Sequence, residues 1–155
     1  MTEKNINLSL RKKSAARVAA VQCVYEGLIA DAPIAPAKQI EDLKTRLKNN
    51  KEEQKLTLGE AIEPNYSLLK DIIEGVAKFC EEIDQRITPN LSADWKRERM
   101  SKLLIAILQC ATFELFFYKE GKEKIIIDEY TRLTDRFFDQ AEVNFVHGIL
   151  KKLAG

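Results

Sequence analysis

Four cations lie close together near the start of the chain: Arg11, Lys12, Lys13 and Arg17. They follow Ser9, a residue type that caps helices, and they lead into an alanine-rich run with apolar residues at helical spacing. If a helix begins at Ser9, the first three cations occupy its first turn, where the macrodipole disfavours each by roughly 0.3–1 kcal/mol. Free N–H groups and cations at one place favour an anion. RNA fits this description, and an ordinary solvated basic tail is the alternative.

The basic charge is concentrated at this end of the chain. Residues 1–17 hold five Lys or Arg and one Glu, a net charge of +4, whereas the whole chain of 155 residues carries only +1. A near-neutral total argues against a strongly basic coat protein. We therefore expect any nucleic-acid binding to be local, and weak without a partner.

Residues that could support catalysis are few and scattered. His147 is the single histidine, and no Cys or Asp cluster accompanies it, so it predicts no metal site. Asp128 and Glu129 are neighbours, which on a helix point about 100° apart and cannot act as a paired acid and base. No phosphate-binding glycine loop or nucleophile motif is present. We expect neither an enzyme nor a cofactor.

Three cysteines, Cys23, Cys80 and Cys110, lie in apolar helical runs and show no metal-ligand spacing. Buried thiols in a reducing cytoplasm are the simplest interpretation. The beginning of the sequence lacks the apolar stretch of a signal peptide. The most apolar segment, 103–118, is too short and too polar to span a bilayer comfortably, so we expect a core helix and no membrane partner.

Three further residues allow two interpretations each. Glu114 interrupts the most apolar segment, so its carboxylate must either form an internal salt bridge or face a protein partner. Tyr25 lies two turns beyond Arg17, either at the core edge or beside the basic patch. Phe145 is off the apolar face of its segment, so it either packs internally or stacks on a nucleic-acid base.

Apolar periodicity near 3.6 residues predicts helices along nearly the whole chain. The expected helices cover 9–29, 37–48, 66–87, 92–98, 100–118, 127–138 and 142–154, with Gly121 ending the fifth of them. The strand-like run 125–127 is too short to build a sheet. The polar stretch 49–64 reads as a long mobile loop, an insertion or a lid.

These elements predict an all-α fold of about seven helices in one domain spanning the chain. We expect an N-terminal bundle over 9–64, with an insertion at about 31–64, and a C-terminal bundle over 65–155. The sequence leaves open whether the protein is a monomer or a homodimer.

Three segments in order resemble one known family. The run 16–25 matches the pattern A-R-x-x-A-x-Q-x-x-Y, and Ala-Thr-Phe-Glu-Leu at 111–115 matches A-x-Y/F-E-L. The end of the chain, with Ile-Asp-Glu at 127–129, Arg136-Phe137 and Phe-Val-x-Gly-Ile-Leu-x-Lys-Leu-Ala at 145–154, is similar to I-N-E…F…F-V-N-G-V-L-x-K-x-A. These segments resemble the NusB family of bacterial transcription antitermination proteins. Only 1–8 and 31–64 fall outside the resemblance.

The resemblance implies an all-helical protein of two small bundles that is not an enzyme. It implies binding of the boxA element of nascent RNA jointly with a small-subunit ribosomal protein, NusE. That pair would join an antitermination complex on RNA polymerase, chiefly in ribosomal RNA operons. Carried over by position, the basic helix with Arg17 would contact phosphates and Phe145 would lie on the RNA surface. Tyr25 and Glu114 would lie near the ribosomal-protein face.

The chain departs from the family pattern at several positions. Phe138 stands where glycine is usual, Asn144 replaces a common lysine, and Asp128 and His147 both replace asparagine. The lost lysine removes one expected phosphate contact. A helical protein–protein adaptor that has lost RNA binding is therefore the alternative function.

Overall fold

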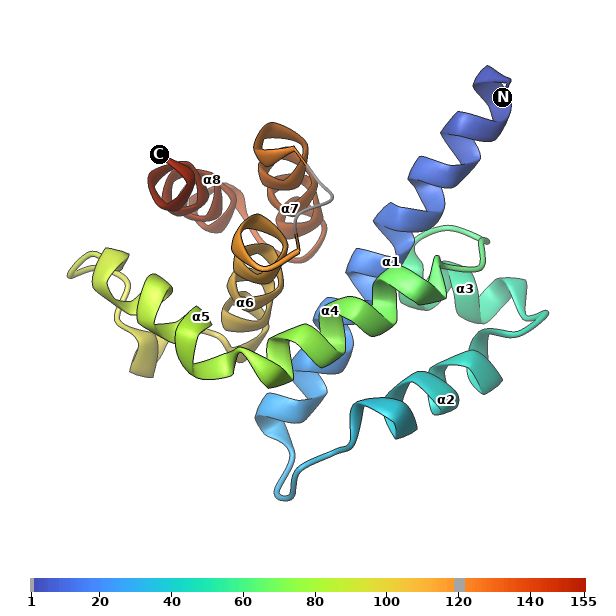
Figure 1. Cartoon of the computed structure of the whole chain (residues 1–155), viewed down its shortest axis with the longest axis horizontal. Helices are drawn as coiled ribbons and strands as arrows, with labels where there is room; N and C mark the ends of the chain where they lie inside the picture. The colour runs from blue at the N-terminus through green and yellow to red at the C-terminus, as the bar shows by residue number, and fades with distance from the viewer. Residues whose placement is uncertain (1, 119–121) are drawn as a thin grey trace. The chain divides into compact units, whose positions relative to one another are not determined.

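The computed structural model describes residues 2–118 and 122–155, and every regular element within them is a helix (Figure 1). The α-helices are α1 (Glu3–Ile29), α2 (Pro36–Leu47), α3 (Lys51–Leu58), α4 (Tyr66–Lys78), α5 (Cys80–Ile87), α6 (Lys102–Phe116), α7 (Glu123–Phe137) and α8 (Gln140–Ala154). Two short 3-10 helices, η1 (Thr88–Asn90) and η2 (Arg97–Arg99), lie between α5 and α6. The expected all-α class is confirmed. The expected seven helices become eight α-helices over the described ranges.

The chain divides into two compact units, Met1–Glu74 and Gly75–Gly155. The first unit holds α1, α2, α3 and most of α4. The second holds the end of α4 and all later helices. None of the helices described is long and apolar enough to cross a membrane.

Helix α1 begins earlier than its sequence suggested. Thr2, not Ser9, is its N-cap, and the Thr2 side chain accepts a hydrogen bond from the backbone N–H of Asn5 at 3.3 Å. Glu3 follows in the first turn, where a carboxylate suits the helix dipole. Arg11 therefore lies more than two turns inside the helix. The argument that its cations meet free N–H groups at a helix start is wrong.

Residues 49–63 form no open loop, because they contain helix α3. Asn50 caps its start by accepting the backbone N–H of Glu53 at 3.1 Å. Gly59 ends it with φ 82°, a left-handed conformation that glycine adopts without steric cost. The sequence favoured a mobile loop here because the segment is polar, yet both ends carry good capping residues.

Two glutamine side chains fasten α3 within the first unit. Gln54 on α3 is buried and donates to the backbone carbonyl of Leu47 at 2.8 Å. Gln22 on α1 donates to the carbonyl of Thr57 at 2.7 Å. Each of these hydrogen bonds contributes about 0.5–1.5 kcal/mol, and removal of one partner leaves the other polar group without its hydrogen bond. The early proteolysis that a mobile loop would show is therefore not expected.

Leu58→Ala tests whether α3 is part of the folded unit. The Leu58 side chain is 4% exposed, so its truncation should lower the free energy of unfolding by about 2–5 kcal/mol. Leu56 lies two residues earlier and is 77% exposed, and Leu56→Ala should change the free energy by no more than about 0.5 kcal/mol. Urea unfolding followed by circular dichroism measures both. Equal stabilities of the two variants would show that α3 does not pack.

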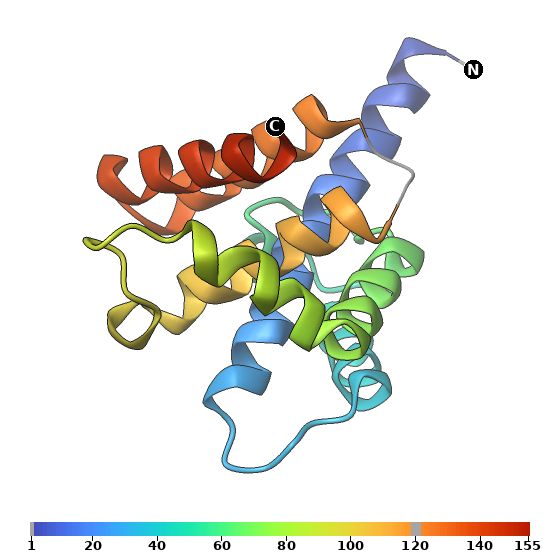
Figure 2. The ribbon, with the colours of Figure 1, turned by 60° about the vertical axis from the view of Figure 1, so that its left-hand side comes forward.

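In the second unit, α6 is the central helix, and α7 and α8 lie side by side (Figure 2). Eleven successive residues of α6, from Leu104 to Glu114, are buried. The expected core helix over 100–118 is therefore found, somewhat shortened. The glycine that was expected to end it, Gly121, lies outside the described residues.

The single helix expected over 66–87 is broken at Phe79, which separates α4 from α5. Phe79 has φ −104° and ψ 22°, and its ring stacks on Phe117 with centroids 4.5 Å apart. Gly75, one turn earlier, lies so close to the ring of Phe113 that any Cβ there would overlap it. Close aromatic packing thus governs this part of the second unit.

Two smaller expectations also fail. Residues 92–98 form no α-helix, since only a turn and the start of η2 fall there. The strand-like run 125–127 lies inside α7, where Ile126 and Ile127 are buried and Ile125 is half exposed. The run therefore belongs to a helix that buries Ile126 and Ile127 and turns Ile125 toward solvent.

The three thiols differ in accessibility, which corrects the expectation that all are buried. Cys23 and Cys110 are buried, whereas Cys80 is exposed at the start of α5. Burial raises the pKa of Cys23 to about 12. Partial desolvation, and then the carboxylate of Asp84, raise the pKa of Cys80 above its usual value.

We expect one thiol of the native protein to react with iodoacetamide, and three after unfolding in urea. Because the thiolate is the nucleophile, the raised pKa of Cys80 means that the native rate should still rise above pH 9. Mass spectrometry of the alkylated protein at several pH values measures both number and rate. Cys80→Ser should abolish the native reaction, and rapid labelling of that variant would contradict the burial of Cys23 and Cys110.

Candidate nucleic-acid interface

The cations of the N-terminal patch differ in their availability to a ligand. Arg11 is exposed but forms an ion pair with Glu60, which lies between α3 and α4. An exposed pair of this kind contributes little to stability, about 0–1 kcal/mol, but it neutralises the Arg11 charge locally. A phosphate would compete with Glu60 for the Arg11 guanidinium if Arg11 contacts RNA.

Lys12 and Lys13 differ in their exposure to solvent. Lys13 is exposed, and Lys12 is half-buried where α1 meets the start of α4. The carbonyl of Lys12 accepts the backbone N–H of Asn65 at 3.0 Å, which fixes the α1 backbone at this point. The positions of both lysines on α1 are thus well defined, although their side chains lie on the flank of the helix and not at its N-terminus.

A pocket of about 480 Å³ adjoins Lys12. One side of the pocket is formed by α1, with Asn5, Leu8, Ser9 and Lys12. The other side is formed by the start of α4 and the two residues before it, which are Pro64, Asn65 and Tyr66. The pocket therefore combines a cation, amides, a hydroxyl and an aromatic ring. These are groups that can contact both the phosphates and the bases of RNA.

Tyr66 at this pocket is held by its neighbours. Its hydroxyl donates to Glu63 at 2.6 Å, and the Lys44 ammonium lies 5.0 Å from the centroid of its ring. Burial, together with this hydrogen bond to a carboxylate, raises the pKa of Tyr66 well above its usual range, so the phenol is neutral at physiological pH. A neutral ring next to Lys12 presents no repulsive charge to a polyanion.

Arg17, expected to contact phosphates, is only 7% exposed in the middle of α1. Every residue from Ala15 to Val21 is likewise buried. Arg17 is not without an interaction partner. The role of Arg17 in phosphate binding stays a prediction. Its burial favours a structural role within α1 over a direct contact with phosphates.

Glu114 and Tyr25, expected near a protein partner, lie in different settings. Glu114 is 2% exposed and accepts a hydrogen bond from the hydroxyl of Tyr130 on α7. Its carboxylate is therefore satisfied inside the second unit. Tyr25 is half-buried near the C-terminal end of α1, with part of its ring at the surface. The partner roles of both residues stay predictions.

Phe145 is half-buried and its ring stacks on that of Trp95, with centroids 4.2 Å apart and planes 17° from parallel. The ring of Phe145 therefore packs on Trp95 and also keeps some exposed surface, and its stacking on a base stays a prediction. The sequence predicted only a short helix over 92–98 and did not indicate the pairing of Trp95 with Phe145. The signal that could have indicated it is an isolated tryptophan inside a segment rich in lysine and arginine.

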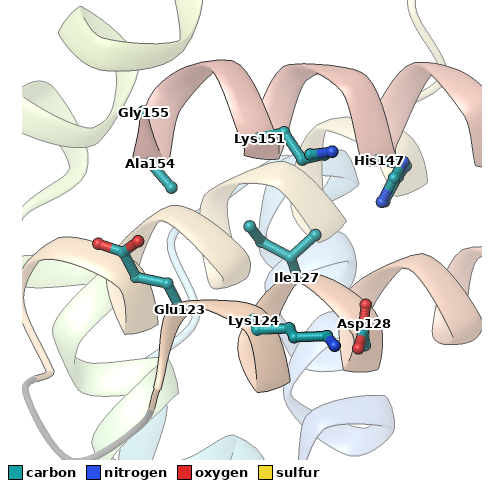
Figure 3. Close-up of a pocket in the computed structure, with 8 residues that line it drawn as sticks. All are labelled: Glu123, Lys124, Ile127, Asp128, His147, Lys151, Ala154 and Gly155. Atoms are coloured by element: carbon teal, nitrogen blue, oxygen red, sulfur yellow. The ribbon is translucent and has the colours of Figure 1, made fainter.

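The single histidine lines a groove between α7 and α8 (Figure 3). His147 and Lys151 project from α8, and Ile127, Glu123 and Asp128 project from α7 on the other side. The groove has a volume of about 390 Å³ and carries charges of both signs. Among the residues that the structure describes, no group of three or more His, Cys, Asp or Glu is arranged to hold a metal ion.

Comparison with known proteins identifies the family. The model of the NusB family matches residues 14–155. A protein named transcription antitermination protein NusB from Sphingopyxis alaskensis is 29% identical over 145 residues, covering 94% of this chain and 93% of its own. A protein of the same name from Clostridium botulinum is 30% identical over 122 residues, covering 75% of this chain and 85% of its own.

Two solved structures share the fold. One is described as a crystal structure of the antitermination factors NusB and NusE in complex with dsRNA; its matching chain has a TM-score of 0.71 at 22% identity, covering 93% of this chain and 96% of that chain. The other, NusB from T. maritima, has a TM-score of 0.67 at 22% identity, covering 92% and 89%. Since the family model spans nearly the whole sequence, the chain belongs to the NusB family.

Proposed function

We propose that this protein is a transcription antitermination factor that binds boxA-type RNA together with the small-subunit ribosomal protein NusE. The pair would promote read-through by RNA polymerase, chiefly in ribosomal RNA operons. The observation that carries the proposal is the family match over residues 14–155, which includes every segment on which the sequence resemblance rests. Because transcription is the process acted upon, the proposal also implies a cytoplasmic location.

In the first unit, Lys12 and Lys13 support an RNA contact. Both are cations on the same stretch of α1, and Lys12 adjoins the pocket that also holds Tyr66. Arg11 would join them by releasing Glu60. Arg17 would support the helix from within, since it is 7% exposed. Cations of this kind add affinity through phosphates and carry little sequence information.

In the second unit, Phe145 supports an RNA contact, because its ring retains exposed surface while Trp95 holds it in place. Tyr25 supports the proposed contact with NusE, since an aromatic ring partly at the surface is a frequent anchor in protein interfaces. Glu114, satisfied by Tyr130, would act on the partner face only through the shape of α6.

A read-through assay tests the proposal. RNA polymerase transcribes a template that has a boxA element upstream of a terminator, with and without the protein and NusE. The two proteins together should raise the full-length fraction on the boxA template, and a template with a scrambled element should show no increase. Equal read-through on both templates would contradict the proposed function.

The adaptor without RNA binding remains the second candidate, favoured by two observations. The chain has a net charge of only +1, and Arg11 is already paired with Glu60. An adaptor would bind NusE with unchanged affinity whether or not RNA is present. Its NusE affinity would also be insensitive to substitution of Lys12 and Lys13.

A further inference from the structure

The strongest unassigned feature of the second unit is the stacked pair of Trp95 and Phe145. The rings lie nearly parallel at van der Waals contact, with centroids 4.2 Å apart and an interplanar angle of 17°. Neither ring is buried, since both side chains are of intermediate exposure. Phe145 lies off the buried face of α8, which is formed by Val143, Val146, Ile149 and Leu150. The pair is therefore a packed aromatic surface that is still open to solvent.

The segment that carries Trp95 is anchored, although it contains no α-helix. The Trp95 backbone N–H donates to the carbonyl of Ser92 at 3.0 Å. Two residues later, Arg97 donates to the carboxylate of Asp84 on α5 at 2.9 Å, and Gln109 on α6 donates to the same carboxylate oxygen at 3.2 Å. Arg97 thus ties the segment to α5, and Gln109 ties α5 to α6. The Trp95 ring itself is held against Phe145 of α8 before any ligand arrives. Preorganisation of this kind lowers the entropic cost of binding.

Cations flank the aromatic pair along the chain. Lys96, Arg99 and Lys102 are all exposed within seven residues of Trp95. Arg97, in contrast, forms an ion pair with Asp84. The same segment carries the exposed carboxylates of Asp94 and Glu98, so its exposed cations outnumber its exposed anions by one. Aromatic rings beside exposed cations are a combination by which proteins bind single-stranded nucleic acid: the cations attract phosphates and the rings stack on bases. A carboxylate-rich protein segment would satisfy the cations but would leave the two rings without a planar ligand.

We propose that Trp95 is an RNA-contact residue of this protein, and that Trp95 and Phe145 together form a stacking platform for an unpaired base. Lys96, Arg99 and Lys102 hold the phosphates on either side of that base. This inference rests on the proposed function, because it names a second contact surface for the same RNA. It adds to that function a residue, Trp95, and a requirement, which is that at least one bound base is unpaired.

Trp95 is the only tryptophan in the chain, so its intrinsic fluorescence reports on this site alone. The protein is titrated with a single-stranded boxA-type oligonucleotide, with the same strand annealed to its complement, and with polyphosphate, which has charge but no bases. Each titration is repeated with NusE in which any tryptophan is replaced by phenylalanine. Binding is followed in parallel by anisotropy of a labelled oligonucleotide, with polyphosphate binding read from its displacement.

The single strand should quench Trp95 fluorescence with the same midpoint as the anisotropy change. The duplex should quench it less, and polyphosphate should bind without quenching. Quenching by polyphosphate equal to that by RNA would show a charge effect and overturn the stacking platform. RNA binding with unchanged Trp95 fluorescence would also overturn it, while leaving the proposed function intact. Absence of RNA binding, alone and with NusE, would overturn both.

Substitutions give a second, independent test. Trp95→Ala should weaken single-stranded RNA binding on the order of 5- to 150-fold, the range measured for loss of one base-stacking aromatic, and should leave polyphosphate binding unchanged. Trp95→Phe keeps a stacking ring and should restore most of the affinity. Lys96→Ala is the matched control for charge: it should reduce the salt dependence of binding and leave the quenching amplitude unchanged. An equal loss of RNA and polyphosphate affinity in Trp95→Ala would show a structural role only.

Discussion

Glu114→Lys is expected to destabilise the second unit severely. The Glu114 carboxylate is 2% exposed and accepts the Tyr130 hydroxyl, so the variant places an ammonium where a carboxylate is hydrogen-bonded. Breaking a buried charged interaction typically costs about 3–5 kcal/mol, and a reversed charge adds its own desolvation. The free energy of unfolding should fall by at least this amount. Because the chain has two compact units, Trp95 fluorescence should follow the second unit, while circular dichroism follows all helices.

Two milder variants separate the hydrogen bond from the charge. Glu114→Gln keeps an oxygen that can accept the Tyr130 hydroxyl, so it should cost less than Glu114→Lys. Tyr130→Phe removes the donor and should cost about 1–3 kcal/mol. Glu74→Lys on α4 makes the same charge change at an exposed site and should alter stability by no more than about 0.5 kcal/mol. A Glu114→Lys protein as stable as Glu74→Lys would contradict the buried setting of Glu114.

The same series tests the partner role predicted from sequence. If Glu114 contacts NusE directly, Glu114→Gln should fold normally and still lose NusE affinity. If Glu114 acts only within the second unit, loss of NusE binding should follow loss of stability through all three variants. Calorimetric titration of NusE into each folded variant distinguishes the two.

Replacing both Lys12 and Lys13 with alanine should weaken RNA binding about equally for every RNA sequence. Each lost phosphate contact should lower the slope of log K against log salt by about 0.7–0.9, so the double variant should lose roughly 1.4–1.8 units of slope. If these contacts contribute nothing at 1 M salt, the double variant should bind RNA at 0.1 M salt roughly 25- to 60-fold more weakly than the unsubstituted protein. Anisotropy titrations at four or more salt concentrations measure the slope.

Lys48 and Lys51 provide a control with the same change in net charge. Both are exposed where α2 ends and α3 begins, and neither lines the pocket that adjoins Lys12. Their joint replacement by alanine should leave the salt slope within about half a unit, since a lysine that makes no phosphate contact releases no counterion from the RNA. Equal slopes for the two double variants would show that the N-terminal lysines act by net charge alone.

Much of the second unit could be predicted from the sequence, because its helices are positioned by apolar periodicity. The apolar run that includes Leu108 became the buried helix α6, and the face of α8 that includes Val146 and Leu150 is buried as its spacing indicated. Such patterns are strong because burial of apolar side chains is the largest favourable contribution to folding.

Other elements could not be predicted because distant contacts decide them. Helix α3 packs through the amides of Gln54 and Gln22, whose acceptors lie 7 and 35 residues away. The break at Phe79 occurs within an unbroken apolar period, where the ring stacks on Phe117. Neither kind of interaction produces a periodic pattern in the sequence from which it could be predicted.

The candidate site shows the same division. The basic residues could be found by composition, but the burial of Arg17 and the pairing of Arg11 with Glu60 depend on the folded backbone. Trp95 could be noticed as an apolar anchor, while its stacking on Phe145 joins residues 50 positions apart. Sequence therefore indicated which residue types could bind RNA, and the structure shows which of them are accessible.

The most direct test of the central claim is the affinity for boxA-type RNA measured with the protein alone, NusE alone and both together, at one salt concentration. The account predicts positive coupling of about 1–3 kcal/mol, so that the mixture binds at least about fivefold tighter than either protein alone. A scrambled RNA of equal length should bind the mixture at least tenfold more weakly. An affinity of the mixture equal to that of its tighter component, with no preference for the boxA-type RNA, would contradict the account.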